Sequence, residues 1–216
     1  MEPLSAGNGK VDHAVDALRR DRPVILPTDT VYGLCASPYS SEPVERAYEL
    51  KGRTATQPSA LLAADVDMLL ECVPELRSRI GTMLRALLPG PLTLVVPNPG
   101  QRYRWLTGSN PDAIGVRVPD LPAPAAAVLS RIGAVMATSA NLAGGPDPRT
   151  VDEIPQEILD GCGAVVDAGE LPGTPSTVID LTGDEPQVLR EGAVPAAEAL
   201  ARVRGLSAGA AASSRG

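Results

Sequence analysis

The chain contains no phenylalanine, and aromatic side chains make up only 2% of its 216 residues. Leucine, valine, isoleucine and alanine must therefore fill the core, and strands have to be recognised from aliphatic runs. Long apolar runs are missing as well: no stretch approaches the roughly 20 residues that span a bilayer, and residues 1–10 lack the apolar centre of a signal peptide. These absences predict a cytoplasmic protein with no membrane partner.

Metal-binding patterns are also missing from the sequence. The three cysteines, Cys35, Cys72 and Cys162, lie far apart without a CxxC pair, and His13 is the only histidine. We therefore expect no protein-bound metal and three reduced, mostly buried thiols. Cys35 has no histidine or asparagine partner that would argue for a nucleophile. His13 falls in an amphipathic segment, where it should face solvent.

The two common phosphate-binding patterns, GxxxxGK[ST] and GxGxxG after a strand, do not occur. The basic excess of proteins that coat nucleic acid is lacking too, because 19 lysines and arginines face 26 aspartates and glutamates, for a formal net charge of -7. Arg102, Arg104 and Trp105 could form a local base-stacking patch. For that segment we favour a solvated loop with Trp105 packed underneath.

What the sequence does contain is an alternation of short aliphatic runs with amphipathic segments. We expect helices at 11–20, 42–51, 74–88, 124–131, 151–159 and 195–203, and strands at 23–27, 59–63, 92–96, 114–118, 134–138, 164–166, 177–181 and 187–189. Thr28 to Leu34 should be a turn-rich loop. This order predicts an α/β fold with a mixed sheet, because a tight Gly183-Asp184 turn joins the last two strands.

A chain of this length with 44% hydrophobic residues buries one sizeable core, and a second full domain would be crowded. We expect a single domain over residues 11–204 and a flexible N-terminus at residues 1–10. Residues 205–216 are almost entirely glycine, alanine and serine, which predicts a disordered tail.

Four short polar segments stand at the ends of apolar runs, where an open α/β sheet gathers its ligand-binding groups. They are Lys51-Gly-Arg53, Gly115-Val-Arg117-Val-Pro119, Thr138-Ser139-Ala-Asn141 and Leu189-Arg190-Glu-Gly192. Their four cations, together with the hydroxyl and amide pair of Ser139 and Asn141, suit a ligand rich in phosphate, such as a nucleotide. Each segment alone is weak evidence, since a Lys-x-Arg at a helix end also caps the helix.

Side-chain chemistry gives these groups different tasks. We expect Lys51 to act as a mobile point charge, and Arg53 and Arg117 as rigid forks that clamp phosphate or carboxylate in bidentate fashion. Arg117 lies in an otherwise apolar strand, where a buried guanidinium needs an anionic partner. Ser139 and Asn141 can supply a hydroxyl and an amide at the edge of a strand.

The same segments belong to a longer series of motifs: Leu26-Pro-Thr-Asp-Thr-Val-Tyr-Gly-Leu34, Lys51-Gly-Arg53, Pro89-Gly-Pro-Leu-Thr93, Val116-Arg117-Val-Pro119, Ser139-Ala-Asn141, Ser176-Thr-Val178 and Leu189-Arg-Glu-Gly192. In this order they resemble the YrdC/TsaC family of threonylcarbamoyl-adenylate synthases, over about residues 11 to 195. Seven motifs in register are far more specific than any one of them. The resemblance implies a single-domain twisted open mixed sheet with flanking helices, in the short form of the family.

The resemblance also implies an enzyme, a nucleotidyltransferase that condenses L-threonine, bicarbonate and ATP to threonylcarbamoyl-AMP and pyrophosphate. Mg2+ would be carried by the nucleotide. The product would feed the threonylcarbamoyl modification of adenosine 37 in tRNA through downstream transfer proteins, with tRNA bound only indirectly or weakly. This chemistry needs no enzyme nucleophile, because positioning and charge stabilisation dominate nucleotidyl transfer.

For the nucleotide, the resemblance implies roles for two sets of residues. Lys51, Arg53, Ser139 and Asn141 match the KxR and SxN signature of the family, around the ATP phosphates and the reacting centre. We expect these four residues to be both catalytic and ATP-binding. Arg190 matches the arginine of the late LRxG segment, also on the nucleotide side.

For the amino acid, the resemblance implies Thr30, Arg117 and Ser176 as threonine-binding residues, with Arg117 clamping the threonine carboxylate. On sequence alone, Thr30 and Ser176 are as readily explained by hydroxyls that bond to their own turns.

Three departures from the family pattern stand out. The segment Thr54–Ser59 replaces a proline followed by lysine or asparagine, although Gln57 could still donate to a phosphate or ribose and is therefore kept as an ATP-binding candidate. Leu62 stands where longer relatives place a histidine. Ala143-Gly144 and Asp147 stand where the family often shows serines, so that two hydroxyl donors are lost.

Two alternative functions stay open at this point. One is a paralogue of the same fold that adenylates another carbamate or carbamoyl donor, which the altered Thr54–Ser59 segment favours. The other is a non-catalytic RNA-binding module, against which the acidic charge balance counts.

Overall fold

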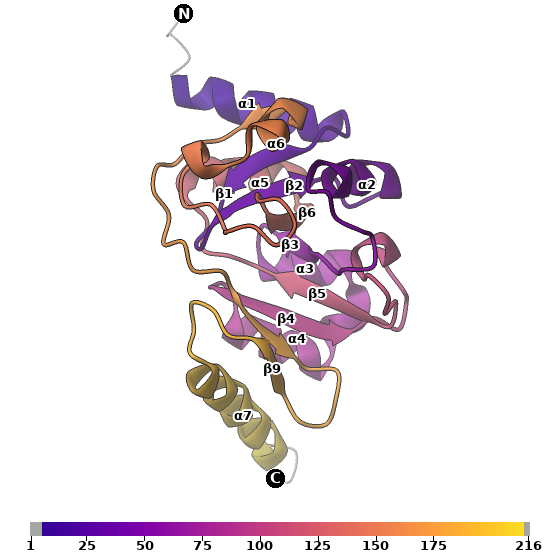
Figure 1. The fold of residues 1–216 in the computed structure, drawn as a ribbon. Helices are drawn as coiled ribbons and strands as arrows, with labels where there is room; N and C mark the ends of the chain where they lie inside the picture. The colour runs from indigo at the N-terminus through magenta and orange to yellow at the C-terminus, as the bar shows by residue number, and fades with distance from the viewer. Residues whose placement is uncertain (1–5, 214–216) are drawn as a thin grey trace, which may run out of the picture.

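The computed structural model describes residues 6–213, in which nine strands form one mixed sheet flanked by helices (Figure 1). The strand order is β7-β1-β2-β6-β3-β5-β4-β8-β9. The bounds are β1 Val24–Pro27, β2 Tyr32–Ala36, β3 Ala60–Ala63, β4 Leu92–Pro97, β5 Ala113–Arg117, β6 Ala134–Ser139, β7 Ala164–Val165, β8 Thr177–Asp180 and β9 Gln187–Arg190. The predicted fold class is confirmed, including the antiparallel pairing of β8 with β9.

The helices are α1 Ala6–Arg19, α2 Ser41–Leu50, α3 Val66–Cys72, α4 Arg79–Leu87, α5 Ala123–Ile132, α6 Gln156–Gly161 and α7 Ala196–Ser213, with short 3-10 turns at Pro74–Arg77, Arg104–Leu106 and Val151–Glu153. They form three groups around this sheet, one of α1 and α5, one of α2 and α6, and one of α3, α4 and α7. Along the long axis of the molecule, α1 lies at one end and α7 at the other (Figure 1).

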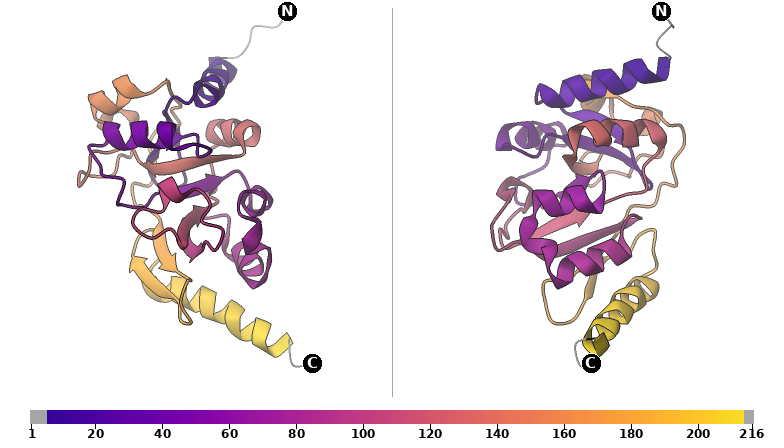
Figure 2. Two further views of the ribbon diagram at one scale, coloured as in Figure 1. Left: turned by 90° about the vertical axis from the view of Figure 1, so that its right-hand side faces the viewer. Right: turned by 180° about the vertical axis from the view of Figure 1, so that it is seen from behind.

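Strands β1 and β2 are covered on both faces, because successive side chains of a strand point in opposite directions. Val24, Leu26 and Cys35 pack in one apolar cluster with α1 and α5, whereas Ile25 and Leu34 pack in another with α2 and α6. The left panel of Figure 2 shows these two helix layers on either side of the strands. This part of the sheet therefore has no face left for a ligand.

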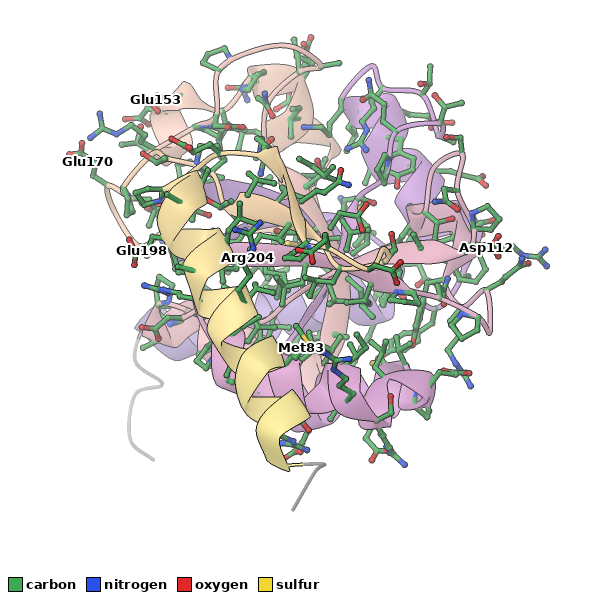
Figure 3. The ribbon with its side chains drawn as sticks, turned by 90° about the horizontal axis from the view of Figure 1, so that it is seen from below. Met83, Asp112, Glu153, Glu170, Glu198 and Arg204 are labelled. Carbon is green, nitrogen blue, oxygen red and sulfur yellow. The ribbon has the colours of Figure 1, made fainter. Side chains whose placement is uncertain are left out.

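Strands β5, β4 and β8 are covered on one face only. Leu94, Val116 and Ile179 pack into a cluster with α3, α4 and α7, and Figure 3 shows Met83 of α4 beside α7. The alternate residues of the same strands are partly exposed, as the burial pattern of β4 shows. Within the described chain no helix covers that second face, and it is available for the functional site.

Four elements inside the domain differ from the expectation. The helices predicted at 74–88 and 151–159 are each divided into a 3-10 turn and a separate helix, α4 and α6. Tyr32 to Leu34 belong to β2 rather than to a loop, because this segment pairs with β1 on one side and β6 on the other. Helix α3 was not expected; it begins after Asp65, whose side chain accepts a hydrogen bond from the Met68 backbone N–H at 2.7 Å, a standard N-cap.

The chain ends also differ from the expectation. Helix α1 begins at Ala6, within the segment expected to be flexible, and α7 continues to Ser213, through most of the expected disordered tail. Alanine has the highest helix propensity of all residues, which compensates for the low apolar content of this stretch. Residues 1–5 and 214–216 lie outside the described residues, and the division into domain and loose ends stays a prediction.

The structure also places several other residues discussed from the sequence. His13 is exposed on α1, and the three cysteines are free thiols, two of them buried. Trp105 packs beside the α2 cluster and its indole N–H donates to the Pro38 carbonyl at 2.8 Å, while Arg102 and Arg104 are exposed. No described helix has both the length and the apolar character needed to cross a membrane.

Candidate active site

A cavity of about 590 Å³ lies on the open face of β5, β4 and β8 and extends to the end of α2. It is lined by eight of the residues selected from the sequence: Lys51, Arg53, Gln57, Arg117, Ser139, Asn141, Ser176 and Arg190. Thr30 is the exception. Residues from both halves of the chain and all four polar segments thus meet at one site.

Lys51 follows the last residue of α2 and holds the segment after β6. Its ammonium donates to the Ser139 carbonyl, to the Asn141 carbonyl at 2.7 Å and to Asn141 Oδ1 at 3.0 Å, and its own carbonyl accepts from the Ala143 N–H at 3.0 Å. Only 3% of the residue is exposed. The expectation of a mobile point charge is wrong, because all three ammonium protons are directed at this one segment.

Burial lowers the pKa of the Lys51 ammonium to about 8, with the charge of Arg53 acting in the same direction and Asp147 opposing it. A deprotonated Lys51 has two protons left for its three acceptors.

We therefore expect turnover to fall as the pH rises past about 8, because Lys51 loses one of the protons that hold Ser139 and Asn141. The free energy of unfolding should change in the opposite sense. The folded-state pKa is the lower one, so between pH 8 and the ordinary lysine range the unfolded chain binds more protons, and stability from this group rises with pH. A pH-rate profile measured together with urea unfolding curves separates the effect on turnover from the effect on stability. Turnover that stays constant up to pH 10 would contradict the role given to the Lys51 ammonium.

Arg53 is fixed by the loop that departs from the family pattern. Its guanidinium lies over the Tyr48 ring at 5.0 Å and donates to Thr138 Oγ1 at 3.0 Å and to the carbonyls of Gln57 and Pro58. Its Nε is buried and has no partner among the described residues. Burial lowers the pKa of the guanidinium. The altered loop therefore supplies backbone acceptors that hold Arg53 in place.

Ser139 and Asn141 form a small network at the start of the following loop. Ser139 Oγ donates to Asn141 Oδ1 at 2.5 Å, and Asn141 Nδ2 donates to the Gly145 carbonyl at 2.6 Å. The backbone N–H groups of Leu142 and Gly144 have no acceptor in the described part of the chain, and both residues line the cavity. This loop consequently offers backbone donors to an anion even though the serines of the family pattern are absent.

Arg117 has the anionic partner that its buried position requires. It donates to Asp29 and, at 2.7 Å, to Thr30 Oγ1, and both members of the ion pair have side chains that are 10% exposed. Its Nε is buried and has no partner among the described residues. Burial lowers the pKa of the guanidinium, and Asp29 opposes that shift. Thr30 is fully buried, so it supports Arg117 from below and does not reach the cavity.

Arg190 of β9 and Ser176, which precedes β8, both line the cavity and bond to each other. Arg190 donates to the Ser176 carbonyl at 2.8 Å and to its Oγ at 3.3 Å, and Ser176 Oγ shares a hydrogen bond of 2.7 Å with Thr93 Oγ1. Burial is the main cause of the lowered pKa of Arg117, and the charge of Arg190 acts in the same direction. Ser176 is therefore part of the site, beyond any bond to its own turn.

Sequence reasoning assigned no role to Asp29, Thr93 or Thr138. Each lies inside or beside a quoted motif, but a motif does not reveal which residue of another segment will touch it. The one available signal was the buried Arg117, which required a carboxylate without naming Asp29. Asp147 and Asp180 also line the cavity. The described residues contain no group of three or more His, Cys, Asp or Glu side chains that could hold a metal ion.

The family model of Sua5, YciO and YrdC, described as "Telomere recombination", matches residues 16–192. A Pyrococcus abyssi protein named threonylcarbamoyl-AMP synthase is 33% identical over 190 residues, which are 88% of this chain and 56% of that protein. An Escherichia coli protein of the same name is 36% identical over 176 residues, 79% of this chain and 91% of that protein. The chain thus spans about half the length of its longer relatives, including 56% of one from Bacillus subtilis.

Solved structures agree with these matches. The crystal structure of P. abyssi Sua5 complexed with L-threonine aligns with a TM-score of 0.82 and 32% identity, over 93% of this chain and 58% of that one. The resemblance derived from the seven motifs is confirmed by these comparisons.

Proposed function

The chain belongs to the Sua5/YciO/YrdC family, and from that premise we propose that it is a threonylcarbamoyl-AMP synthase. It condenses L-threonine, bicarbonate and ATP to threonylcarbamoyl-AMP and pyrophosphate. The observation that carries this proposal is the meeting of four basic side chains in one cavity of an otherwise acidic protein: Lys51, Arg53, Arg117 and Arg190.

The reaction has two steps, formation of a carbamate and its adenylation. The threonine amine attacks the carbon of bicarbonate to give the N-carboxylate of threonine and water. An oxygen of this carbamate then attacks the α-phosphorus of ATP, and the bond from that phosphorus to the β-phosphate oxygen breaks to release pyrophosphate. No side chain forms a covalent bond in either step, so the protein acts by holding the reactants in line and by offsetting the charge on the phosphates.

The cavity divides into two halves that suit the two substrates. On one side, Arg53, Gln57, Ser139, Asn141 and the N–H groups of Leu142 and Gly144 bind the triphosphate, with Lys51 holding the loop and supplying positive charge. On the other side, Arg117 and Ser176 bind threonine, with Thr30 supporting Arg117. Arg190 donates to Ser176 and lines the same cavity as Arg117, so we assign it to the junction of the two substrates.

The nucleotide brings Mg2+ with it. This ion prefers water and phosphate oxygens to cages made only of protein ligands, and bound there it would neutralise charge on the leaving pyrophosphate. The product passes to transfer proteins that modify adenosine 37 of tRNA in the cytoplasm, so contact of this chain with tRNA is indirect.

The proposal is tested by mass spectrometry of the products formed from ATP, bicarbonate and one of three acceptors or donors: threonine, serine or carbamoyl phosphate. We expect threonylcarbamoyl-AMP with threonine and little product otherwise. An adenylate formed only from carbamoyl phosphate would identify the chain as a paralogue of different specificity. Absence of any adenylate together with a tRNA gel shift at moderate salt would favour the RNA-binding alternative.

A further inference from the structure

Gly115 lies on β5 in the middle of the cavity floor, and the fold does not require it to be glycine. Its φ is outside the left-handed region. A Cβ placed on it would meet the Ser59 carbonyl oxygen and Thr93 Cγ2 at 3.7 Å and Ala60 Cα at 3.8 Å, which are ordinary contacts. At Gly192, by contrast, a Cβ would lie 2.1 Å from the Pro175 carbonyl oxygen. The backbone needs glycine at 192 but not at 115.

The neighbours of Gly115 on the β3 side are also small, whereas its partner on β4 is Val95. Ala60 of β3 pairs with Gly115 of β5 on one side and with Ala137 of β6 on the other. All three line the cavity. In this row, three adjacent strands present nothing larger than a methyl group, where a sheet in a packed core would carry valine or leucine, as β4 does at Val95.

This row of small residues lies between two groups of cations, Lys51 and Arg53 on the β6 side and Arg190 on the β4 side. On the β6 side, Ala137 is followed by Thr138 and Ser139, which bond to Arg53 and Lys51. On the β4 side, Thr93 contacts the space above Gly115 and bonds to Ser176, which receives Arg190. The side chain of Arg117, two residues along β5, is 10% exposed and its Nε has no partner in the described chain. The unfilled space is therefore central, and Arg117, whose buried Nε has no partner in the described chain, lines the same cavity.

We propose that Gly115 keeps open the space in which the carbamate of the amino acid meets the α-phosphate, and that it is a positioning residue of the reaction. This inference rests on the proposed function. Reacting atoms must approach to roughly 3 to 3.5 Å in line, and a displacement of about 1 Å can cost a hundredfold in rate. A methyl group at residue 115 occupies the meeting point without touching the cations that bind each substrate separately.

The test compares wild type with Gly115→Ala and with Gly183→Ala. Gly183 is a matched control, since it lies outside the cavity, its φ is not left-handed, and a Cβ there would meet only the Glu185 carbonyl oxygen at 3.8 Å. Three quantities are measured: thermal unfolding, binding of ATP and of threonine alone by calorimetry, and pyrophosphate release with both substrates. For Gly115→Ala we expect unchanged unfolding, separate affinities within about threefold of wild type, and a kcat lower by about tenfold or more.

Each other outcome overturns the inference in a recognisable way. Turnover of Gly115→Ala within twofold of wild type shows that the space is not needed. Loss of affinity for one substrate alone, as large as the loss of turnover, shows that the space belongs to that substrate and not to the junction. A wild-type protein that releases no pyrophosphate with threonine would overturn the proposed function itself, and the inference with it.

Discussion

Lys51→Ala is expected to lower threonine-dependent pyrophosphate release by about two to three orders of magnitude, which corresponds to the roughly 2.7 to 4 kcal/mol lost when one preorganised stabilising donor is removed. The variant removes a positive charge from the cavity and three hydrogen bonds that hold Ser139 and Asn141. The fold should survive with reduced stability, because the cost of burying the charge is removed but the carbonyls of Ser139 and Asn141 lose their donor. Timed assays of pyrophosphate release measure the effect on turnover, and thermal unfolding measures the effect on stability.

The chain offers a matched control for this change. Lys10, its only other lysine, is exposed on α1, so Lys10→Ala should leave turnover unaltered. Lys51→Arg tests geometry at constant charge: a planar guanidinium cannot point three donors at the same three acceptors, and most of the loss should remain. Full activity in Lys51→Arg would show that charge alone matters, and normal turnover in Lys51→Ala would remove Lys51 from the site.

Arg117→Met is expected to lower the free energy of unfolding by about 3 to 5 kcal/mol, because Asp29 is left as a buried charge without its partner. Turnover should fall below detection with threonine, since the same guanidinium is proposed to clamp the carboxylate. Urea unfolding measures the change in the free energy of unfolding. Arg131→Met is the control: Arg131 pairs with Asp12 on the surface, where the side chains are 41% and 53% exposed, and its loss should cost less than about 1 kcal/mol.

A second substitution separates the two roles of Arg117. Asp29→Asn in the Arg117→Met chain removes the stranded charge, so most of the lost stability should return while turnover stays absent. A double variant that regains turnover would show that Arg117 serves only the fold. A single variant with unchanged unfolding would show that Asp29 does not depend on Arg117.

The sequence predicted the sheet, most helices and eight residues of the cavity wall, because aliphatic periodicity and motif order are local properties. The predictions of secondary structure failed where a neighbouring strand or a distant segment decides the structure. Tyr32 to Leu34 look like a turn until β1 and β6 flank them. The alanine-rich end of the chain looks unstructured until helix propensity is weighed against its lack of apolar residues.

At the candidate site, too, local patterns were predictable and contacts between distant segments were not. Residue types identified a site for anions, but the partner of each cation comes from another segment. Lys51 looks mobile in sequence, and only the loop after β6, 88 to 90 positions later, immobilises it. Thr30, expected to bind threonine, is fully buried and accepts a hydrogen bond from Arg117. Such pairings depend on register between strands that are distant in the chain, which no local pattern encodes.

The order in which the chain supplies its cations has a consequence for biosynthesis. Arg190 is on β9, and β8 reaches its place beside β4 only after some 80 intervening residues have been made. During translation, a nascent chain that already carries Lys51, Arg53 and Arg117 still lacks Arg190 and the Ser176 to which it bonds. The cavity therefore gains its fourth cation only when β9 has been made, and a product terminated before β9 would lack the cation proposed for the junction of the two substrates.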